Sequence, residues 1–332
     1  MRFALMIEAQ QGLTYEDQLV IARQAEAGGF EALFRSDHYA SFPGSSGQVT
    51  TDAWVVLAGL ARETSTIGLG TLVSPVTFRH PGNFAKLVTT VDHMSGGRLE
   101  VGVGAGWNDD DHLPLGLPFP SMDARADLLE DQLELLHGLW TEPDGWSYDG
   151  NQITVRNGSL QPRPVEVAGR PRGRDGRTPD GRARPRIITG GQGTPRGFRI
   201  AVRWSDEFNL TSSSASVAKA KMAELDDACR AAGRDPATLA RSAMVGVLIG
   251  RDEGELRHRA DEQRAAFGVS GGDADSWLDE HRARWIVGTP DEARATIRGY
   301  AEAGIERIML QDMLPLDAGM IDLMAQEILG RV

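Results

Sequence analysis

The sequence predicts a single (β/α)8 TIM barrel, and two observations lead to this fold class. Eight short apolar runs are spread along the chain, and each is followed by a longer amphipathic segment with helical spacing. The length of 332 residues also suits eight strand–helix units in one domain. Because strands that alternate with helices form a parallel sheet covered by helices, the whole chain, residues 1–332, is expected to be one barrel with insertions.

The apolar runs give the expected strands, and the amphipathic segments give the expected helices. Strands are expected at residues 2–7, 30–34, 66–73, 99–103, 186–189, 207–210, 244–249 and 307–310. Helices are expected at residues 14–28, 51–62, 80–94, 121–140, 196–202, 217–232, 291–303 and 318–329.

Helix start and stop signals support the first and the seventh of these helices. Thr14 is a capping residue with Asp17 three positions later, and Gly28 and Gly29 end that helix. Near the C-terminus Thr289 caps a helix that begins with Pro290.

A doubly wound open sheet is the rival architecture, and the number of strands does not exclude it. The barrel accounts for more of the sequence, because no strand is followed by a dinucleotide-binding fingerprint. Gly102, Gly104 and Gly106 have glycine-rich spacing, but they close a strand and open no helix within the required distance.

Two segments interrupt the alternation. Residues 145–186 begin as a small β excursion and end in an Arg-, Gly- and Pro-rich stretch, 170–186, which holds seven Arg and two Asp. That composition predicts a mobile loop, and because it precedes a strand it belongs to the N-terminal face of the barrel. Residues 251–287 form a helical insertion after a strand, where the lids of barrel enzymes arise.

Composition excludes several classes of protein. The formal charge of −12 argues against nucleic-acid or anionic-membrane partners, which reward clustered positive charge. No run approaches the roughly 20 apolar residues that cross a bilayer, and the N-terminus lacks a signal-peptide cleavage site. Cys229 has no partner for a disulfide, which fits a reducing compartment. A cytoplasmic protein is expected.

In a barrel, functional residues follow the strands, and the loop after the fifth strand carries the clearest chemical pattern. Three glycines in residues 190–193 precede Thr194, a helix cap, and Pro195. Free backbone N–H groups beside a positive helix end form a phosphate cradle, although a tight turn without a ligand gives the same pattern. Similarly, the glycines at positions 102, 104 and 106 allow either the close approach of a flat ligand to the backbone or close packing between helix and sheet.

Other candidates are weaker. His38, next to Asp37 at the end of the second strand, is a candidate acid or base, or else a histidine that only caps its loop. Residues 109–112 resemble metal ligands, but consecutive aspartates diverge, so a solvated loop and no metal site are expected. No G-x-S-x-G motif supports a serine hydrolase, and Cys229 is expected to pack within its helix.

Taken together, the motifs resemble the luciferase-like family of flavin- and deazaflavin-dependent barrel oxidoreductases, in particular its coenzyme F420-dependent branch. The resemblance covers essentially the whole chain and is specific as a set rather than motif by motif. The motifs that carry it are SDHY at 36–39, TIGLGTLVSPVTFRHP at 66–81, GRLEVGVGAGWN at 97–108, GGQGT at 190–194, WSDEFN at 204–209 and GTPDE at 288–292.

The resemblance implies roles for particular positions. The end of the third strand, Leu72, Val73 and Ser74, would lie under the deazaflavin ring, with a non-prolyl cis peptide between Leu72 and Val73. Asp37 would contact the polar edge of the ring, and His38 would be the proton donor. The remaining cofactor contacts would come from Ala105, Gly106 and Trp107 after the fourth strand, and from Gly190, Gly191, Gln192, Gly193 and Thr194 at the phosphate.

The function that the resemblance implies is hydride transfer between F420 and a small organic substrate. Sugar-phosphate enzymes of the branch carry a catalytic glutamate where this chain has Trp107, and they hold the substrate phosphate with lysines, of which this chain has only three. An apolar substrate is therefore expected. The alternatives are an FMN-dependent monooxygenase that uses O2 and a barrel that binds flavin without catalysis. Members of the family are commonly homodimers.

Overall fold

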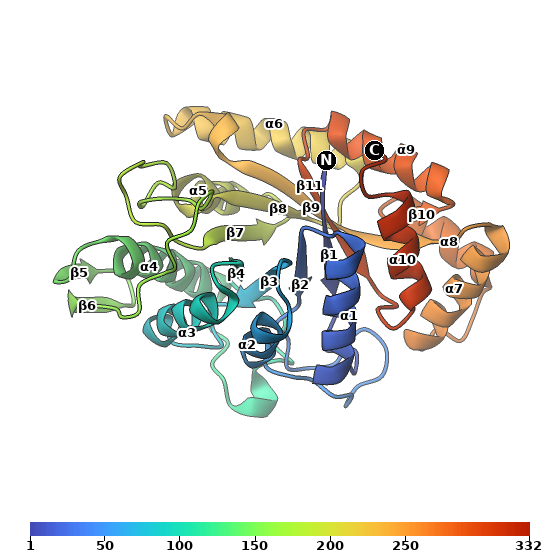
Figure 1. The fold of residues 1–332 in the computed structure, drawn as a ribbon, viewed down its shortest axis with the longest axis horizontal. Helices are drawn as coiled ribbons and strands as arrows, with labels where there is room; N and C mark the ends of the chain where they lie inside the picture. The colour runs from blue at the N-terminus through green and yellow to red at the C-terminus, as the bar shows by residue number, and fades with distance from the viewer.

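The computed structural model describes residues 1–332, and its centre is a closed barrel of eight parallel strands (Figure 1). The strands follow one another around the barrel in chain order, and the last pairs with the first. The predicted fold class is therefore confirmed. The barrel strands are β1 (Arg2–Ile7), β2 (Ala32–Arg35), β3 (Gly68–Pro75), β4 (Leu99–Gly104), β7 (Arg186–Gly191), β8 (Glu207–Thr211), β9 (Ala240–Ile249) and β11 (Arg307–Asp312).

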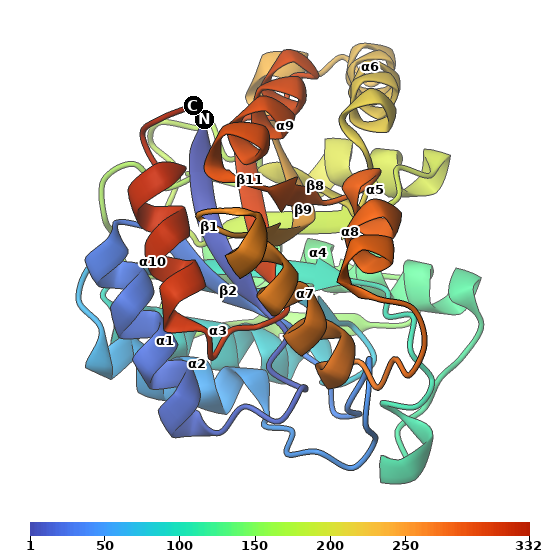
Figure 2. The same cartoon turned by 90° about the vertical axis from the view of Figure 1, so that its right-hand side faces the viewer.

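Eight helices follow these strands. They surround the barrel, and both termini lie side by side at one end of it (Figures 1 and 2). None of the helices combines the length and the apolar composition needed to span a bilayer. The surrounding helices are α1 (Tyr15–Gly28), α2 (Ala53–Glu63), α3 (Pro81–Ser95), α4 (Met122–Thr141), α5 (Pro195–Trp204), α6 (Ala215–Ala231), α9 (Pro290–Glu302) and α10 (Ala318–Glu327).

The third strand shows why some boundaries differ from those expected. It begins at Gly68 rather than at residue 66, because Glu26 of α1 accepts hydrogen bonds from the backbone N–H groups of Ser65, Thr66 and Ile67 (2.8, 2.5 and 3.0 Å). A carboxylate that already satisfies these donors holds the segment as a turn before the strand. The strand also continues two residues beyond the expected end.

The barrel interior has two layers. At the N-terminal end, Arg307 donates to Glu100 at 2.8 and 3.0 Å, with Glu207 3.6 Å away. Above this ionic layer lies a small apolar cluster formed by Ala4, Met6, Ala32, Phe34, Leu72, Ile188 and Met309. Because both layers are filled by side chains, the barrel is a packed core, and a ligand has to bind beyond the C-terminal strand ends.

The first interruption contains a two-stranded antiparallel hairpin, β5 (Trp146–Asp149) and β6 (Thr154–Gly158), followed by the Arg-rich stretch. Parts of that stretch are anchored, contrary to the solvated loop that its composition suggested. Arg170 pairs with Asp92 of α3 and Arg184 pairs with Asp206, each at 2.6 Å and each largely buried. Carboxylates from distant elements supply the partners that the local composition lacks.

The second interruption contains α7 (Glu253–Ala266), α8 (Ala274–Arg282) and a short extra strand, β10 (Ile286–Gly288), which pairs with β9. The end of α7 reaches the loop that follows β2. A Cβ added to Gly44 in that loop would lie only 2.4 Å from the carbonyl oxygen of Ala266. The insertion thus packs directly against the segment that carries His38.

Candidate active site

The candidate site is built from the segments that follow β2, β3, β4 and β7, which are neighbours in the barrel. These are the strands whose ends carry the residues singled out in the sequence. Because parallel strands bring their C-terminal ends to one edge, the structure gathers these segments at the same mouth.

A bulge at the end of β3 forms the centre of the site. The Leu72–Val73 peptide is cis, as predicted, and the pairing of β3 with β4 shifts register between Thr71 and Ser74. The side chain of Val73 thereby enters the barrel mouth.

Gly102 and Gly104 of β4 and Gly190 of β7 all lie next to Val73. A Cβ at Gly104 would lie 2.7 Å from Val73 Cγ2, and one at Gly190 would lie 3.6 Å from Val73 Cγ1. At Gly102 the space is taken by backbone, since an added Cβ would lie 2.0 Å from the Thr71 carbonyl oxygen. Close packing of the chain against itself therefore explains the glycines at positions 102 and 104. Val73, which is half-buried, presents an apolar side chain next to them.

His38 follows β2, the strand that pairs with β3, and is held by a carboxylate. Its Nδ1 is 2.6 Å from Asp111 Oδ2, and its Nε2 has no hydrogen-bond partner within the chain. Asp111 Oδ1 also accepts from the backbone N–H groups of Tyr39 and Ala40 at 2.8 and 2.7 Å. Burial raises the pKa of Asp111, but these hydrogen bonds from His38 and the backbone outweigh it and hold that pKa below its ordinary value.

Residues 109–112 are thus not uniformly a solvated loop, and the expectation is corrected for two of them. Asp109 and Asp110 are exposed, whereas Asp111 and His112 are buried. His112 places Nε2 2.6 Å from Thr77 Oγ1 and Nδ1 2.8 Å from the Asn108 carbonyl oxygen. No group of three or more His, Cys, Asp and Glu side chains is arranged to hold a metal ion.

Two further aromatic rings surround His38. Its ring packs edge-on against Phe42 and Trp107, with centroid distances of 4.6 and 5.7 Å, and Phe42 and Trp107 are themselves 5.3 Å apart. Trp107 is 65% exposed, so most of the indole is open to solvent. An apolar or aromatic molecule can therefore be covered by this face.

Asp37 lies differently from what the resemblance implied. Its carboxylate is fully buried, where it accepts from Arg79 at 2.6 Å and from Ser74 Oγ at 2.7 Å. Arg79 also pairs with Asp52 at 2.5 Å, and Trp54 Nε1 donates to Ser74 Oγ at 2.8 Å. Because its side chain is enclosed, Asp37 has no exposed oxygen that could contact a ring. It stabilises the bulge by accepting the hydrogen bond from Ser74.

The cradle, residues 190–194, connects β7 to α5. Gly193 adopts a φ of +71°, a conformation in which a side chain would be strained, and an added Cβ would lie 2.7 Å from Phe198. Thr194 Oγ1 accepts from the Gly197 N–H at 3.1 Å, and Pro195 is the first helical residue. Lys221 of α6 places Nζ 3.2 Å from the Gly193 carbonyl oxygen and 2.9 Å from Glu224, so a cation lies beside the cradle.

Sequence reasoning missed a buried polar network at the centre of the mouth. Glu8 accepts from Gln311 Nε2 at 2.5 Å and from Gln10 Nε2 at 2.8 Å, and Ser36 Oγ donates to Gln10. Glu8 was recognisable as the residue that ends the first strand, but the glutamines gave no signal. Gln311 comes from the other end of the chain, and only strand pairing brings it beside Glu8.

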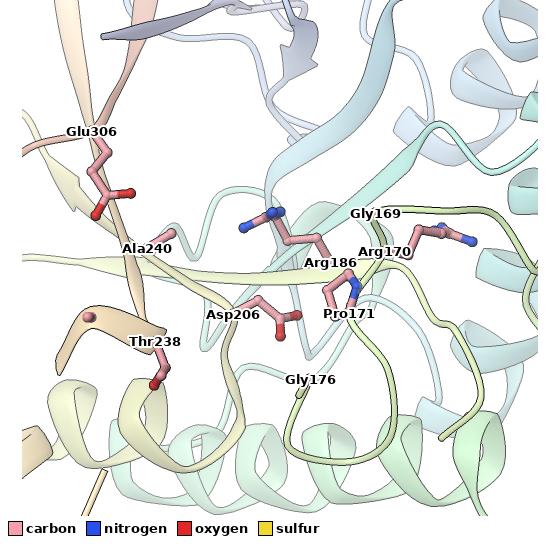
Figure 3. Close-up of a pocket in the computed structure, with 10 residues that line it drawn as sticks. Gly169, Arg170, Pro171, Gly176, Arg186, Asp206, Thr238, Ala240 and Glu306 are labelled. Atoms are coloured by element: carbon pink, nitrogen blue, oxygen red, sulfur yellow. The ribbon is translucent and has the colours of Figure 1, made fainter. Parts of the chain in front are cut away.

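A polar cavity of about 240 Å³ lies at the opposite, N-terminal face and is separate from this site (Figure 3). It is lined by Arg186, Asp206 and Glu306 at the starts of strands, by Arg170, Pro171 and Gly176 of the Arg-rich segment, and by Gly169 just before that segment. The segment therefore lies at the N-terminal face, as expected from its position before a strand.

Comparison with known proteins agrees with this geometry. The luciferase-like monooxygenase family model matches residues 1–307. An uncharacterized protein of Mycobacterium tuberculosis is 30% identical over 256 residues, 68% of this chain and 83% of its own length. An F420-dependent glucose-6-phosphate dehydrogenase of Beutenbergia cavernae is 27% identical over 338 residues, covering 95% of this chain and 93% of that protein.

Among solved structures, an F420-dependent secondary alcohol dehydrogenase in complex with an F420–acetone adduct has the same fold. Its TM-score is 0.80 at 20% identity, with 98% of each chain covered. At that identity the likeness concerns the fold alone, whereas the family model spans nearly the whole sequence. The chain belongs to the luciferase-like monooxygenase family.

Proposed function

We propose that this chain is an F420-dependent oxidoreductase that moves a hydride between the cofactor and a small, apolar organic substrate. The observation that carries the proposal is the bulge at Leu72–Val73, which places an apolar side chain at the end of β3, between β2, the strand that precedes His38, and β4. The family membership and the F420-dependent relative that spans nearly the whole chain support the same reading.

The residues at the mouth fit a flat, anionic cofactor. Val73 offers an apolar surface for a ring system, and Leu72, Ser74, Ala105 and Gly106 flank it. The cradle offers backbone N–H groups, the positive end of α5 and the nearby Lys221 ammonium for a phosphate. When bound, the deazaflavin supplies or accepts the hydride at C5.

His38 is the residue proposed to move a proton. Its Nε2 carries no protein partner, whereas Nδ1 is held by Asp111. An alcohol that loses a hydride from its carbon also loses the hydroxyl proton, and a carbonyl that gains a hydride at carbon needs a proton at oxygen. The Nε2 atom can accept or return that proton at the substrate oxygen.

Trp107 and Phe42 favour an apolar substrate. They form one wall of the mouth beside His38, and neither carries a charge that could pair with a phosphate. Burying such a substrate against the exposed indole removes apolar surface from water on both sides. The α7–α8 insertion, which touches the neighbouring loop at Gly44, is proposed as the lid that excludes water.

Anaerobic turnover tests this proposal. Reduced F420 is mixed with the protein and a panel of small ketones, unsaturated ketones and a sugar phosphate, and oxidation of the cofactor is followed by absorbance. We expect oxidation of F420 without O2 by at least one apolar carbonyl compound and none by the sugar phosphate. Turnover that requires both reduced FMN and O2 would instead establish a monooxygenase.

A further inference from the structure

Asp111 makes more specific contacts than its position in a run of three aspartates suggests. Its side chain is 1% exposed, and its two oxygens have different tasks. Oδ1 accepts two backbone N–H groups, from Tyr39 and Ala40, and Oδ2 lies 2.6 Å from His38 Nδ1. One carboxylate thus holds both the imidazole and the backbone that carries it.

This arrangement decides which ring nitrogen carries the proton. An ionised carboxylate only accepts hydrogen bonds, so His38 Nδ1 has to donate. In the neutral ring the proton then resides on Nδ1, and Nε2 is left as an acceptor. The edge-on contacts with Phe42 and Trp107 hold the plane of the ring, and turning the ring over within that plane would place a carbon instead of Nδ1 against Asp111.

We propose that Asp111 is a positioning residue that fixes His38 in the Nδ1–H tautomer and keeps Nε2 ready to take a proton. The tautomer follows from the contacts of Asp111 alone, whereas the role of Asp111 in catalysis rests on the function proposed above.

Asp111→Asn separates positioning from loop anchoring. The two backbone N–H groups need an oxygen, so the single amide oxygen of Asn takes the place of Oδ1. The amide NH2 then faces His38 Nδ1 and donates to it. The neutral imidazole is forced into the Nε2–H tautomer, which cannot accept a proton at Nε2, while the loop keeps both of its backbone hydrogen bonds.

The test is the ¹⁵N NMR spectrum of the histidine rings in the cofactor-free protein. The chain has seven histidines, and the His38 signals are assigned by their loss in His38→Ala. We expect the Nδ1–H pattern in the parent and in Asp110→Asn, a matched change at the neighbouring exposed aspartate, and the Nε2–H pattern in Asp111→Asn. An Nε2–H pattern in the parent, or no change in Asp111→Asn, would overturn the proposal.

Kinetics extend the test to the proposed function. Asp111→Asn is expected to lower kcat on the order of 10²–10³-fold with the F420 Kd within about threefold, and Asp111→Glu, which keeps a carboxylate, is expected to recover part of the loss. If the parent does not turn over F420 while the tautomer still switches, the proposed function fails and the positioning role stands. If Asp111→Asn does not fold, the tautomer of His38 in the parent tests the proposal by itself: the Nδ1–H pattern supports it and the Nε2–H pattern overturns it.

Discussion

His38 is the residue on which the proposed chemistry depends most directly. His38→Ala removes the proton-transferring group but leaves Val73 and the cradle unchanged. We therefore expect turnover to fall by about 10²–10⁴-fold while the Kd for F420 changes only a few-fold. The measurement is kcat under saturating cofactor together with a fluorescence titration of F420. Turnover within a few-fold of the parent would show that His38 only fills space between Phe42 and Trp107.

Gly102 supports the bulge through the absence of a side chain. In Gly102→Ala the new Cβ would lie 2.0 Å from the Thr71 carbonyl oxygen, so the backbone of the bulge has to move. We expect a loss of stability of about 2 kcal/mol or more, measured by urea unfolding.

Gly190→Ala is the matched control for folding. There the added Cβ would meet its nearest neighbours at 3.6 Å, an ordinary van der Waals distance. The variant should keep a stability near that of the parent. Equal losses in the two variants would contradict the close packing assigned to Gly102.

At the residue scale the sequence predicted some parts of the site and missed others for a physical reason. The resemblance located His38 and the cis peptide at Leu72–Val73 because both lie in contiguous motifs. It implied that Asp37 contacts the polar edge of the ring, but Asp37 is buried and its carboxylate pairs with Arg79. Asp111 was missed because its partner lies 73 residues away, and only the fold distinguishes it from Asp109 and Asp110.

At the scale of elements, the Arg-rich segment is fastened by two buried ion pairs. In Arg184→Met the Asp206 carboxylate would remain buried without its cation, which typically costs about 3–5 kcal/mol. Asp206 keeps its bond from the Ile187 N–H, so the lower end of this range is expected. Urea unfolding of the variant measures the loss.

Arg182→Met is the control within the same segment, because that side chain is exposed. It should change stability by less than about 0.5 kcal/mol. Since the segment lies at the N-terminal face, Arg182→Met should also leave the F420 Kd unchanged at low and moderate salt. If the variant instead bound F420 tenfold more weakly than the parent, and the loss of affinity were greater at low salt, the segment would be shown to attract the cofactor.

The end of β11 carries a carboxyl group whose ionisation opposes folding. Asp312 is fully buried, and Oδ1 accepts from the Leu314 N–H at 2.8 Å while Oδ2 has no partner. Burial raises the pKa of Asp312 from 3.8 to about 7. The folded state therefore binds this proton more tightly than the unfolded chain, and the stability it contributes is lost as the pH rises from about 4 to about 7.

Asp312→Asn should remove this dependence. Relative to the parent, the variant is expected to gain on the order of 2 kcal/mol between pH 5.5 and pH 8, because the amide cannot ionise. Unfolding free energies of both proteins at the two pH values give this difference. A difference between variant and parent that does not change with pH would show that Asp312 titrates normally.

At the scale of the whole molecule, the barrel was predictable because each strand and its helix are local patterns. All eight expected strands and the eight helices that follow them are present, and apart from β1 at least one end of each is shifted. The ends shifted where long-range contacts compete with propensity, as Glu26 does before β3. The Glu8–Gln311 contact at the mouth was not predictable, since only closure of the barrel places β11 beside β1.

We expect this barrel to bind F420 in preference to FMN. The most direct measurement is an equilibrium titration of the purified protein with each cofactor under the same buffer and salt. We expect a lower Kd for F420, because an F420-dependent relative spans nearly the whole chain, whereas the cradle and the apolar side chain of Val73 would suit the phosphate and ring of either cofactor. Micromolar binding of FMN with no detectable binding of F420 would contradict it.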